Sequence, residues 1–204
     1  MINHYQIKDR RLVKGTISNG LQVITLDRPT ENEVKRLCQQ FDLDPITFRY
    51  CNSPEEVSRF NGLNSRVLNQ PHVLVYYDFI ADHPKIEEQL APVIIVFDDR
   101  HLIICSEQVD NWLTKLVIPD ERVVGIILQL LQVGEQHLMV ALRKYKPVID
   151  RLDAAARRTI ENQELRQLTD LTRCLVYFEH TMNDQKTTLE AFLATSLVSE
   201  FDAN

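Results

Sequence analysis

The chain has 204 residues, of which 44% are hydrophobic and 25% charged, and its formal net charge is −6. This length suits one compact domain, or a domain with an appendage, that can bury a core without disulfides. The acidic balance excludes a protein that engages nucleic acid through a basic face. No apolar run reaches the roughly 18 residues that span a bilayer, so we expect the chain as given to be soluble.

The chain has four cysteines, which are widely spaced and form no C-x-x-C pair: Cys38, Cys51, Cys105 and Cys174. This spacing predicts reduced thiols and neither a zinc nor a redox motif. The segment Met1–Arg11 is polar and charged, which indicates no signal peptide. Together these features predict a cytosolic compartment.

The first half of the chain carries strand-like runs, at Leu21–Leu26, Val73–Ile80, Val93–Phe97 and Leu102–Cys105. Runs this apolar predict central strands that are covered on both faces. Asp98-Asp99-Arg100 lies between the last two runs and predicts a hairpin. We interpret its aspartates as turn formers rather than cation ligands.

The same half of the sequence also contains residue patterns that predict the starts of helices. Thr30 and Glu33 predict a capping box, and Asp44-Pro45 predicts a short helix with proline at its first position. Ser53–Glu56 has the same signature, and Gln108–Leu116 is predicted to be a short helix around Trp112, the only tryptophan.

Beyond Pro119 the strand signals stop and heptad-like apolar spacing begins. A first seam contains Pro147, which we expect to kink the helix or to be absorbed locally, and a second seam follows a break near Asn162. Two such helices joined by a short connection pack antiparallel. The first seam is Ile127, Leu131, Gly134, Leu138, Ala141, Tyr145, Val148, Leu152 and Ala155, and the second is Leu165, Leu168, Leu171, Leu175, Phe178, Met182, Leu189 and Phe192.

These patterns predict an α/β fold in which a mixed β-sheet flanked by helices precedes a long antiparallel helical pair. We divide the chain into an α/β domain at 1–118 and a helical extension at 119–204. The second seam has no terminal cap, so we expect the protein to continue beyond Asn204.

The sequence contains no nucleophile elbow, phosphate-binding loop, zinc-protease motif or EF-hand loop. The six histidines are dispersed, so a histidine metal site would require tertiary assembly. We therefore predict no catalytic residues, no cofactor-binding residues and no enzyme activity. Paired carboxylates are candidate Mg²⁺ ligands or simple caps, and they occur at Asp42/Asp44, Glu55/Glu56, Glu87/Glu88, Asp98/Asp99 and Asp120/Glu121.

The order of features resembles the cytosolic part of the CorA family of magnesium and cobalt channels. The passage from Pro29 through Phe41-Asp42-Leu43-Asp44-Pro45-Ile46 is similar to the family's helix followed by Phe-x-[Leu/Ile]-x-Pro-Leu. The strand ending at Tyr77-Asp78, the hairpin that follows and the two long helices also match the family pattern.

The resemblance implies the cytosolic regulatory domain of a divalent-cation channel that is a homopentamer at the cytoplasmic face of the cell membrane. In that family, Mg²⁺ bound between subunits holds the pore shut, so we expect this part to act in ion-dependent gating. The membrane helices and the family's Gly-Met-Asn motif are not in this sequence, where Thr181 precedes Met182-Asn183. A C-terminal truncation would account for their absence.

One departure from the family concerns the ion-sensing position. Many relatives carry Glu-Asp after the Pro-Leu step, whereas this sequence has Arg49 and Tyr50 at the equivalent positions. A cation and a neutral phenol do not replace two hard oxygen ligands. The residues that bind a regulatory metal are therefore unknown, and nearby Asp42, Asp44, Glu55 and Glu56 are the possible substitutes.

The alternative function is a stand-alone cytosolic scaffold or dimerisation module with no transport role.

Overall fold

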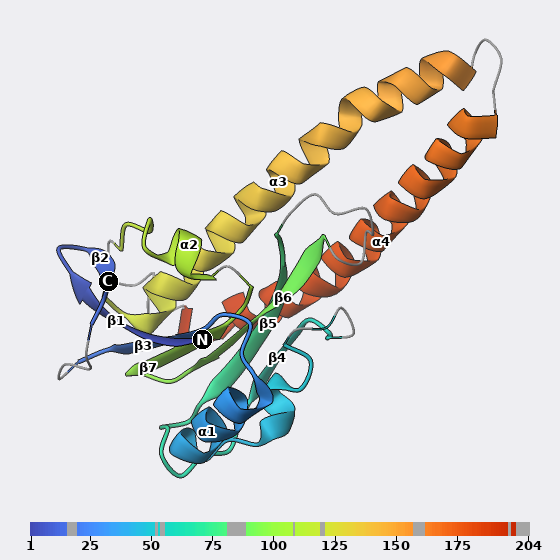
Figure 1. The fold of residues 1–204 in the computed structure, drawn as a ribbon. Coiled ribbons are helices and arrows are strands. Elements are labelled where there is room, and N and C mark those ends of the chain that lie inside the picture. The colour runs from blue at the N-terminus through green and yellow to red at the C-terminus, as the bar shows by residue number, and fades with distance from the viewer. Residues whose placement is uncertain are drawn as a thin grey trace.

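The computed structural model describes residues 1–15, 20–51, 53, 56–80, 89–107, 109–118, 121–156, 162–195 and 197–198. Figure 1 shows a twisted sheet with a short helix on one face and a pair of long helices on the other. The long helices extend past the edge of the sheet and approach each other at their far ends. This is the α/β architecture that the sequence predicts.

The sheet has seven strands in the order β2-β1-β3-β7-β6-β5-β4. The strands β3 and β7 run parallel, and the other neighbours are antiparallel, so the sheet is mixed as predicted. Their bounds are β1 Ile2–Lys8, β2 Arg11–Lys14, β3 Gln22–Leu26, β4 Arg59–Gly62, β5 His72–Phe79, β6 Leu90–Phe97 and β7 His101–Cys105.

The central strands are buried on both faces, as their apolar runs predict. All eight residues of β6 are buried. Alternate side chains on one face, including Tyr76 and Ile95, pack against the long helices, while those on the other face, including Val75 and Ile94, pack against the N-terminal helical segment. The period of two along each strand thus divides the interior into two cores.

The N-terminal helix α1 (Glu31–Phe41) and the 3-10 helix η1 (Pro45–Phe48) cover the second face. The capping box is confirmed: Thr30 Oγ1 accepts from the Glu33 backbone N–H, and the Glu33 carboxylate accepts from the Thr30 N–H at 2.9 Å. Asp44 caps η1 by accepting from the Ile46 N–H at 2.9 Å. The predicted start at Ser53–Glu56 includes Pro54 and Glu55, which lie outside the described residues.

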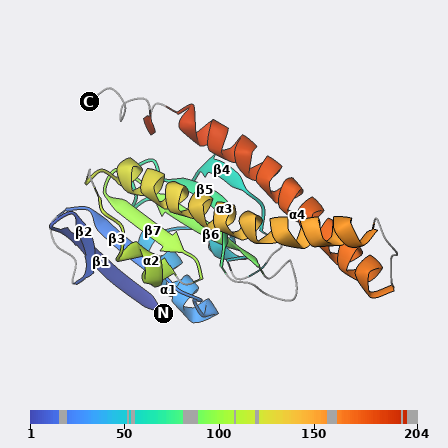
Figure 2. The same cartoon turned by 90° about the horizontal axis from the view of Figure 1, so that it is seen from above.

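The other face is covered by α2 (Val109–Leu113), α3 (Val123–Ala156) and α4 (Asn162–Leu193). Figure 2 shows α3 and α4 crossing over the sheet, with α4 returning towards the end at which α3 begins. With 34 residues, α3 is about 50 Å long. It continues through Pro147 without ending, so the proline is absorbed locally. The predicted antiparallel pair is confirmed.

The second seam is only partly correct. Leu171 and Phe178 are buried, but Leu165 and Leu168 are 50% and 40% exposed. The buried row of α4 includes the predicted Phe192 but also passes through Cys174, Gln185 and Thr188, which the seam did not contain. Gln185 is buried beside the sheet, where its side-chain oxygen accepts from the Tyr77 backbone N–H at 2.8 Å. That N–H lies beyond the last residue of β5 that pairs with β4.

Three strands, β1, β2 and β4, were not predicted from the sequence. They are short or rich in polar residues, and β2 and β4 form the two edges of the sheet. The division into domains at 1–118 and 119–204 stays a prediction. The first turns of α3 nevertheless supply Ile126, Ile127 and Leu130 to the same core as the sheet.

By length and composition alone, Val123–Ala154 of α3 is a helix that could cross a membrane. The sequence expectation that no segment spans a bilayer rested on unbroken apolar runs, and the longest one, Val123–Leu131, is interrupted at Gln129 and followed by Gln132. The inner part of this helix is packed against the sheet, where Ile126 and Ile127 have no exposed surface. A core helix of a soluble domain has the same composition.

Candidate functional site

Two of the candidate metal ligands, Asp42 and Asp44, accept hydrogen bonds from backbone N–H groups. Asp42 ends α1 in the left-handed conformation, with φ of 48°. Its Oδ2 accepts from the Arg66 N–H at 3.1 Å and lies 3.8 Å from Arg66 Nε. Asp44 caps η1, as described above. The Asp44 carboxylate therefore acts as a cap, whereas the Asp42 carboxylate holds the loop at Arg66.

Glu56 is the most deeply buried carboxylate of this region, with a side chain only 2% exposed. It pairs with the Arg59 guanidinium and accepts from the Val57 N–H at 3.0 Å. Arg59 also donates to the Thr47 carbonyl at 3.3 Å, and the Tyr77 hydroxyl donates to the Glu56 carbonyl at 2.5 Å. Burial raises the pKa of Tyr77, which keeps this hydroxyl a donor. These contacts of Glu56 and Arg59 connect the start of β4 to η1 and β5.

Arg49 and Tyr50, which the sequence analysis predicts to stand at the family's ion-sensing positions, form a cation–π pair. The Arg49 guanidinium carbon lies 5.3 Å from the centroid of the Tyr50 ring. Arg49 is exposed and is the C-cap residue of η1, with its N–H donating to the Ile46 carbonyl at 3.2 Å. A positive charge at this position repels a divalent cation.

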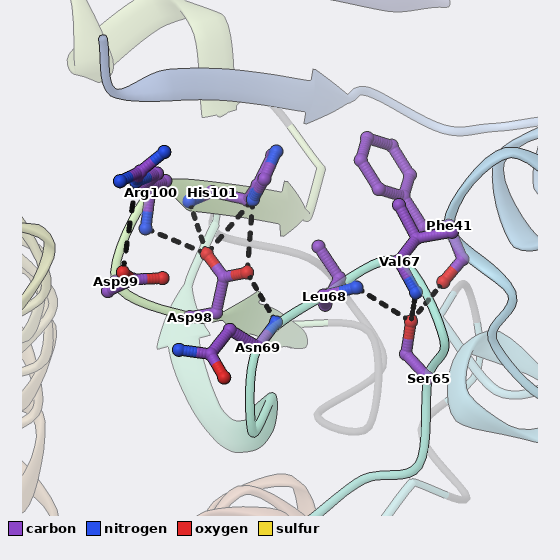
Figure 3. Close-up of polar contacts among 9 residues, drawn as sticks. All are labelled: Phe41, Ser65, Val67, Leu68, Asn69, Asp98, Asp99, Arg100 and His101. Carbon is purple, nitrogen blue, oxygen red and sulfur yellow. Dashed lines mark hydrogen bonds and ion pairs between the residues drawn. The ribbon is translucent and has the colours of Figure 1, made fainter.

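Asp98 holds the turn between β6 and β7 (Figure 3). Its Oδ1 accepts from the Arg100 and His101 N–H groups at 2.8 and 2.6 Å, and its Oδ2 accepts from the Asn69 N–H at 3.0 Å. Burial opposes ionisation of Asp98, but these backbone bonds outweigh it and leave the pKa of the carboxyl below its usual value. Asp99 points to Arg100, 3.8 Å away. The prediction of a turn former is confirmed for Asp98.

The same close-up shows a second polar anchor at Ser65. Its hydroxyl donates to the Phe41 carbonyl at 2.6 Å and accepts from the Val67 and Leu68 N–H groups at 3.0 and 2.9 Å. This residue ties the end of α1 to the loop that carries Asn69, and hence to the Asp98 turn.

Within the described ranges, no group of three or more His, Cys, Asp or Glu side chains could hold a metal ion. The sequence candidates Glu55, Glu87, Glu88 and Asp120 lie outside those ranges. The described residues therefore identify no ligands for a regulatory ion.

An Asp–His pair with a buried carboxylate joins α3 to the sheet and was not predicted from the sequence. His137 Nδ1 lies 2.9 Å from Asp78 Oδ2, and the Asp78 side chain is only 6% exposed. The bond to Asp78 raises the pKa of His137 more than burial lowers it. Gly134, one turn earlier, allows the close approach, because a Cβ there would lie 3.1 Å from Tyr76 Cε2. The available signal was Asp78, an acid inside an otherwise apolar strand.

The family described as CorA-like Mg2+ transporter protein matches residues 18–204. The chain belongs to the CorA-like Mg2+ transporter protein family. This result confirms the resemblance drawn from the sequence. No curated protein matches the chain.

Solved structures share the CorA fold. The CorA magnesium transporter from Methanocaldococcus jannaschii superposes with a TM-score of 0.73 at 12% identity, covering 96% of this chain and 63% of that chain. The soluble domain of the same transporter gives 0.66 at 13% identity, covering 90% and 77%. The ZntB cytoplasmic domain from Vibrio parahaemolyticus RIMD 2210633 gives 0.71 at 10% identity, covering 97% and 82%. This chain thus spans less than two thirds of the length of the complete CorA chain.

Proposed function

We propose that this chain is the cytoplasmic domain of a divalent-cation transporter and that it acts in ion-dependent gating rather than in conduction. The family match over residues 18–204 carries the proposal. The fold supports it, because 97% of this chain superposes on a structure named as a cytoplasmic domain and 90% superposes on one named as a soluble domain. On this reading the domain transports no ion by itself and catalyses no reaction.

The packing of α3 supports a location of this helix outside the bilayer. A membrane-spanning helix turns apolar side chains to lipid, whereas α3 buries Ile126, Ile127 and Leu130 between itself and the sheet. Exposed charges follow on its outer half, including Arg143, Lys144 and Arg151. We place the domain at the cytoplasmic face of the cell membrane, held there by helices that this sequence does not contain.

The proposed assembly is a homopentamer, as in the family that the sequence resembles, with Mg²⁺ as the regulatory ion. An ion shifts a conformational equilibrium only by binding one state more tightly than the other. The described residues offer no three-ligand group, and Arg49 with Tyr50 replaces the expected carboxylates. We therefore place the regulatory ion at ligands shared between subunits or supplied by the rest of the protein.

A scaffold or dimerisation module is the second candidate. Its support is the exposed leucine row of α4, where Leu165 and Leu168 are 50% and 40% accessible. Apolar residues at heptad spacing on an exposed helix face suit helix–helix association.

Reading the gene past codon 204 separates the two candidates. The transporter predicts two apolar segments of about 20 residues each, with Gly-Met-Asn after the first. A stop codon directly after Asn204 contradicts the transporter and leaves the scaffold.

A further inference from the structure

One oxygen of the Glu56 carboxylate has no partner among the described residues. The Glu56 side chain is only 2% exposed, and its Oε1 accepts from the Arg59 guanidinium and from the Val57 N–H at 3.0 Å. Its Oε2 is also buried, yet no donor in the described part of the chain bonds to it. A buried carboxylate oxygen without a donor is costly in free energy, so a donor on a bound molecule would stabilise Oε2.

Glu56 forms part of the wall of a cavity of about 510 Å³. The cavity lies between η1 and the edge strand β4, and its apolar wall includes Ile46, Leu63 and Val73. Cavities that bind small molecules have volumes of about 300–1,000 Å³ and combine apolar walls with a few polar groups. The cavity beside Glu56 therefore suits a small molecule with an apolar part.

Two opposite charges in the wall indicate which polar groups this molecule carries. Glu56 Oε2 favours a positively charged donor, such as an ammonium group. Arg59 is 29% exposed, and its described bonds, to Glu56 and to the Thr47 carbonyl at 3.3 Å, leave further guanidinium N–H donors for a carboxylate. Arg59 would repel a metal cation, and Glu56 would repel a simple anion. A zwitterion matches both charges.

We propose that this cavity binds a free amino acid with an apolar side chain. Its ammonium group donates to Glu56 Oε2, its carboxylate accepts from Arg59, and its side chain contacts the apolar wall. The bound amino acid lies beside Tyr50, which is also part of the cavity wall. This inference goes beyond the proposed transport role and does not depend on it.

The test is a calorimetric titration of the folded 204-residue chain with L-leucine, supported by saturation-transfer NMR on the ligand. We expect saturable binding of one molecule per chain. Isoamylamine lacks the carboxylate of leucine, and isocaproate lacks its ammonium group. Each should bind more weakly than L-leucine by about tenfold or more, because each loses hydrogen bonds to a charged partner.

Two substitutions locate the site. Glu56→Gln removes the negative charge and should weaken L-leucine binding by about tenfold or more. Asn61→Trp should abolish it by filling the cavity, because Asn61 is exposed, lies on the same face of β4 as Arg59 and lines the cavity with it. Val13→Trp, at a 43% exposed position on the opposite edge strand β2, is the matched control and should bind L-leucine as the unsubstituted chain does.

Circular dichroism confirms that each variant is folded. Because Glu56→Gln also weakens the pair with Arg59, Asn61→Trp tests the cavity without removing either charge. The proposal is overturned if L-leucine does not bind at millimolar concentration, or if it binds Asn61→Trp as tightly as the unsubstituted chain. It is equally overturned if isoamylamine or isocaproate binds as tightly as L-leucine.

Discussion

At the scale of single residues, local polar contacts were predictable and tertiary pairs were not. Thr30, Asp44 and Asp98 each bond backbone groups within three positions, so residue type and spacing were sufficient to predict their roles. The Asp78–His137 pair joins residues 59 positions apart. Neither spacing nor composition encodes such a contact, although an acid within an apolar strand signals that a partner exists.

The pH dependence of stability should reveal the Asp78–His137 pair. The pKa of His137 in the folded chain lies above its ordinary value of 6.5, so the pair stabilises the fold fully below that value and less as pH rises through the folded pKa. His137→Gln should cost about 1 kcal/mol near pH 6, a modest figure because His137 is 36% exposed. The measurement is the free energy of unfolding in urea across pH 6 to about 9.

The difference between the unsubstituted chain and His137→Gln should shrink towards alkaline pH. His180→Gln, at an exposed position on α4, is the matched control and should show a small difference at every pH. A His137→Gln difference that stays constant or grows with pH would show that the pair does not contribute as a charged pair.

At the scale of elements, periodicity predicted α3 better than α4. The first seam matches the buried row of α3 at Ile127, Leu138 and Leu152. In α4 the predicted leucines divide between buried and exposed positions, and the buried row includes the polar residues Gln185 and Thr188. Gln185 accepts a hydrogen bond from the Tyr77 N–H of the sheet. Hydrophobic spacing cannot anticipate a buried row that is polar.

Paired alanine substitutions test this assignment of α4. Leu171→Ala removes a side chain that is 8% exposed and should cost about 2–3 kcal/mol of unfolding free energy. Leu168→Ala, one turn earlier and 40% exposed, should cost about 0.5 kcal/mol or less. Urea denaturation measures both. Equal losses would mean that the original leucine seam, rather than the observed row, packs against the rest of the molecule.

At the scale of the whole molecule, the central strands and the helical hairpin were predictable from continuous apolar runs and long seams. The edge strands β2 and β4 were not, because four-residue strands with exposed positions carry too little pattern. The candidate site was predictable only as a departure from the family: Arg49 and Tyr50 stand where carboxylates were expected, and the structure stacks them on each other. The Asp78–His137 pair required the fold.

We propose that this domain belongs to a divalent-cation transporter and gates it. The most direct measurement is Mg²⁺ uptake by lipid vesicles that contain the complete gene product, read with an internal Mg²⁺-sensitive dye. We predict uptake that slows when the vesicles are preloaded with millimolar Mg²⁺ on the side that bears this domain, because bound ion favours the closed state. Absence of uptake would contradict the transport role, and uptake indifferent to preloaded Mg²⁺ would contradict the gating role.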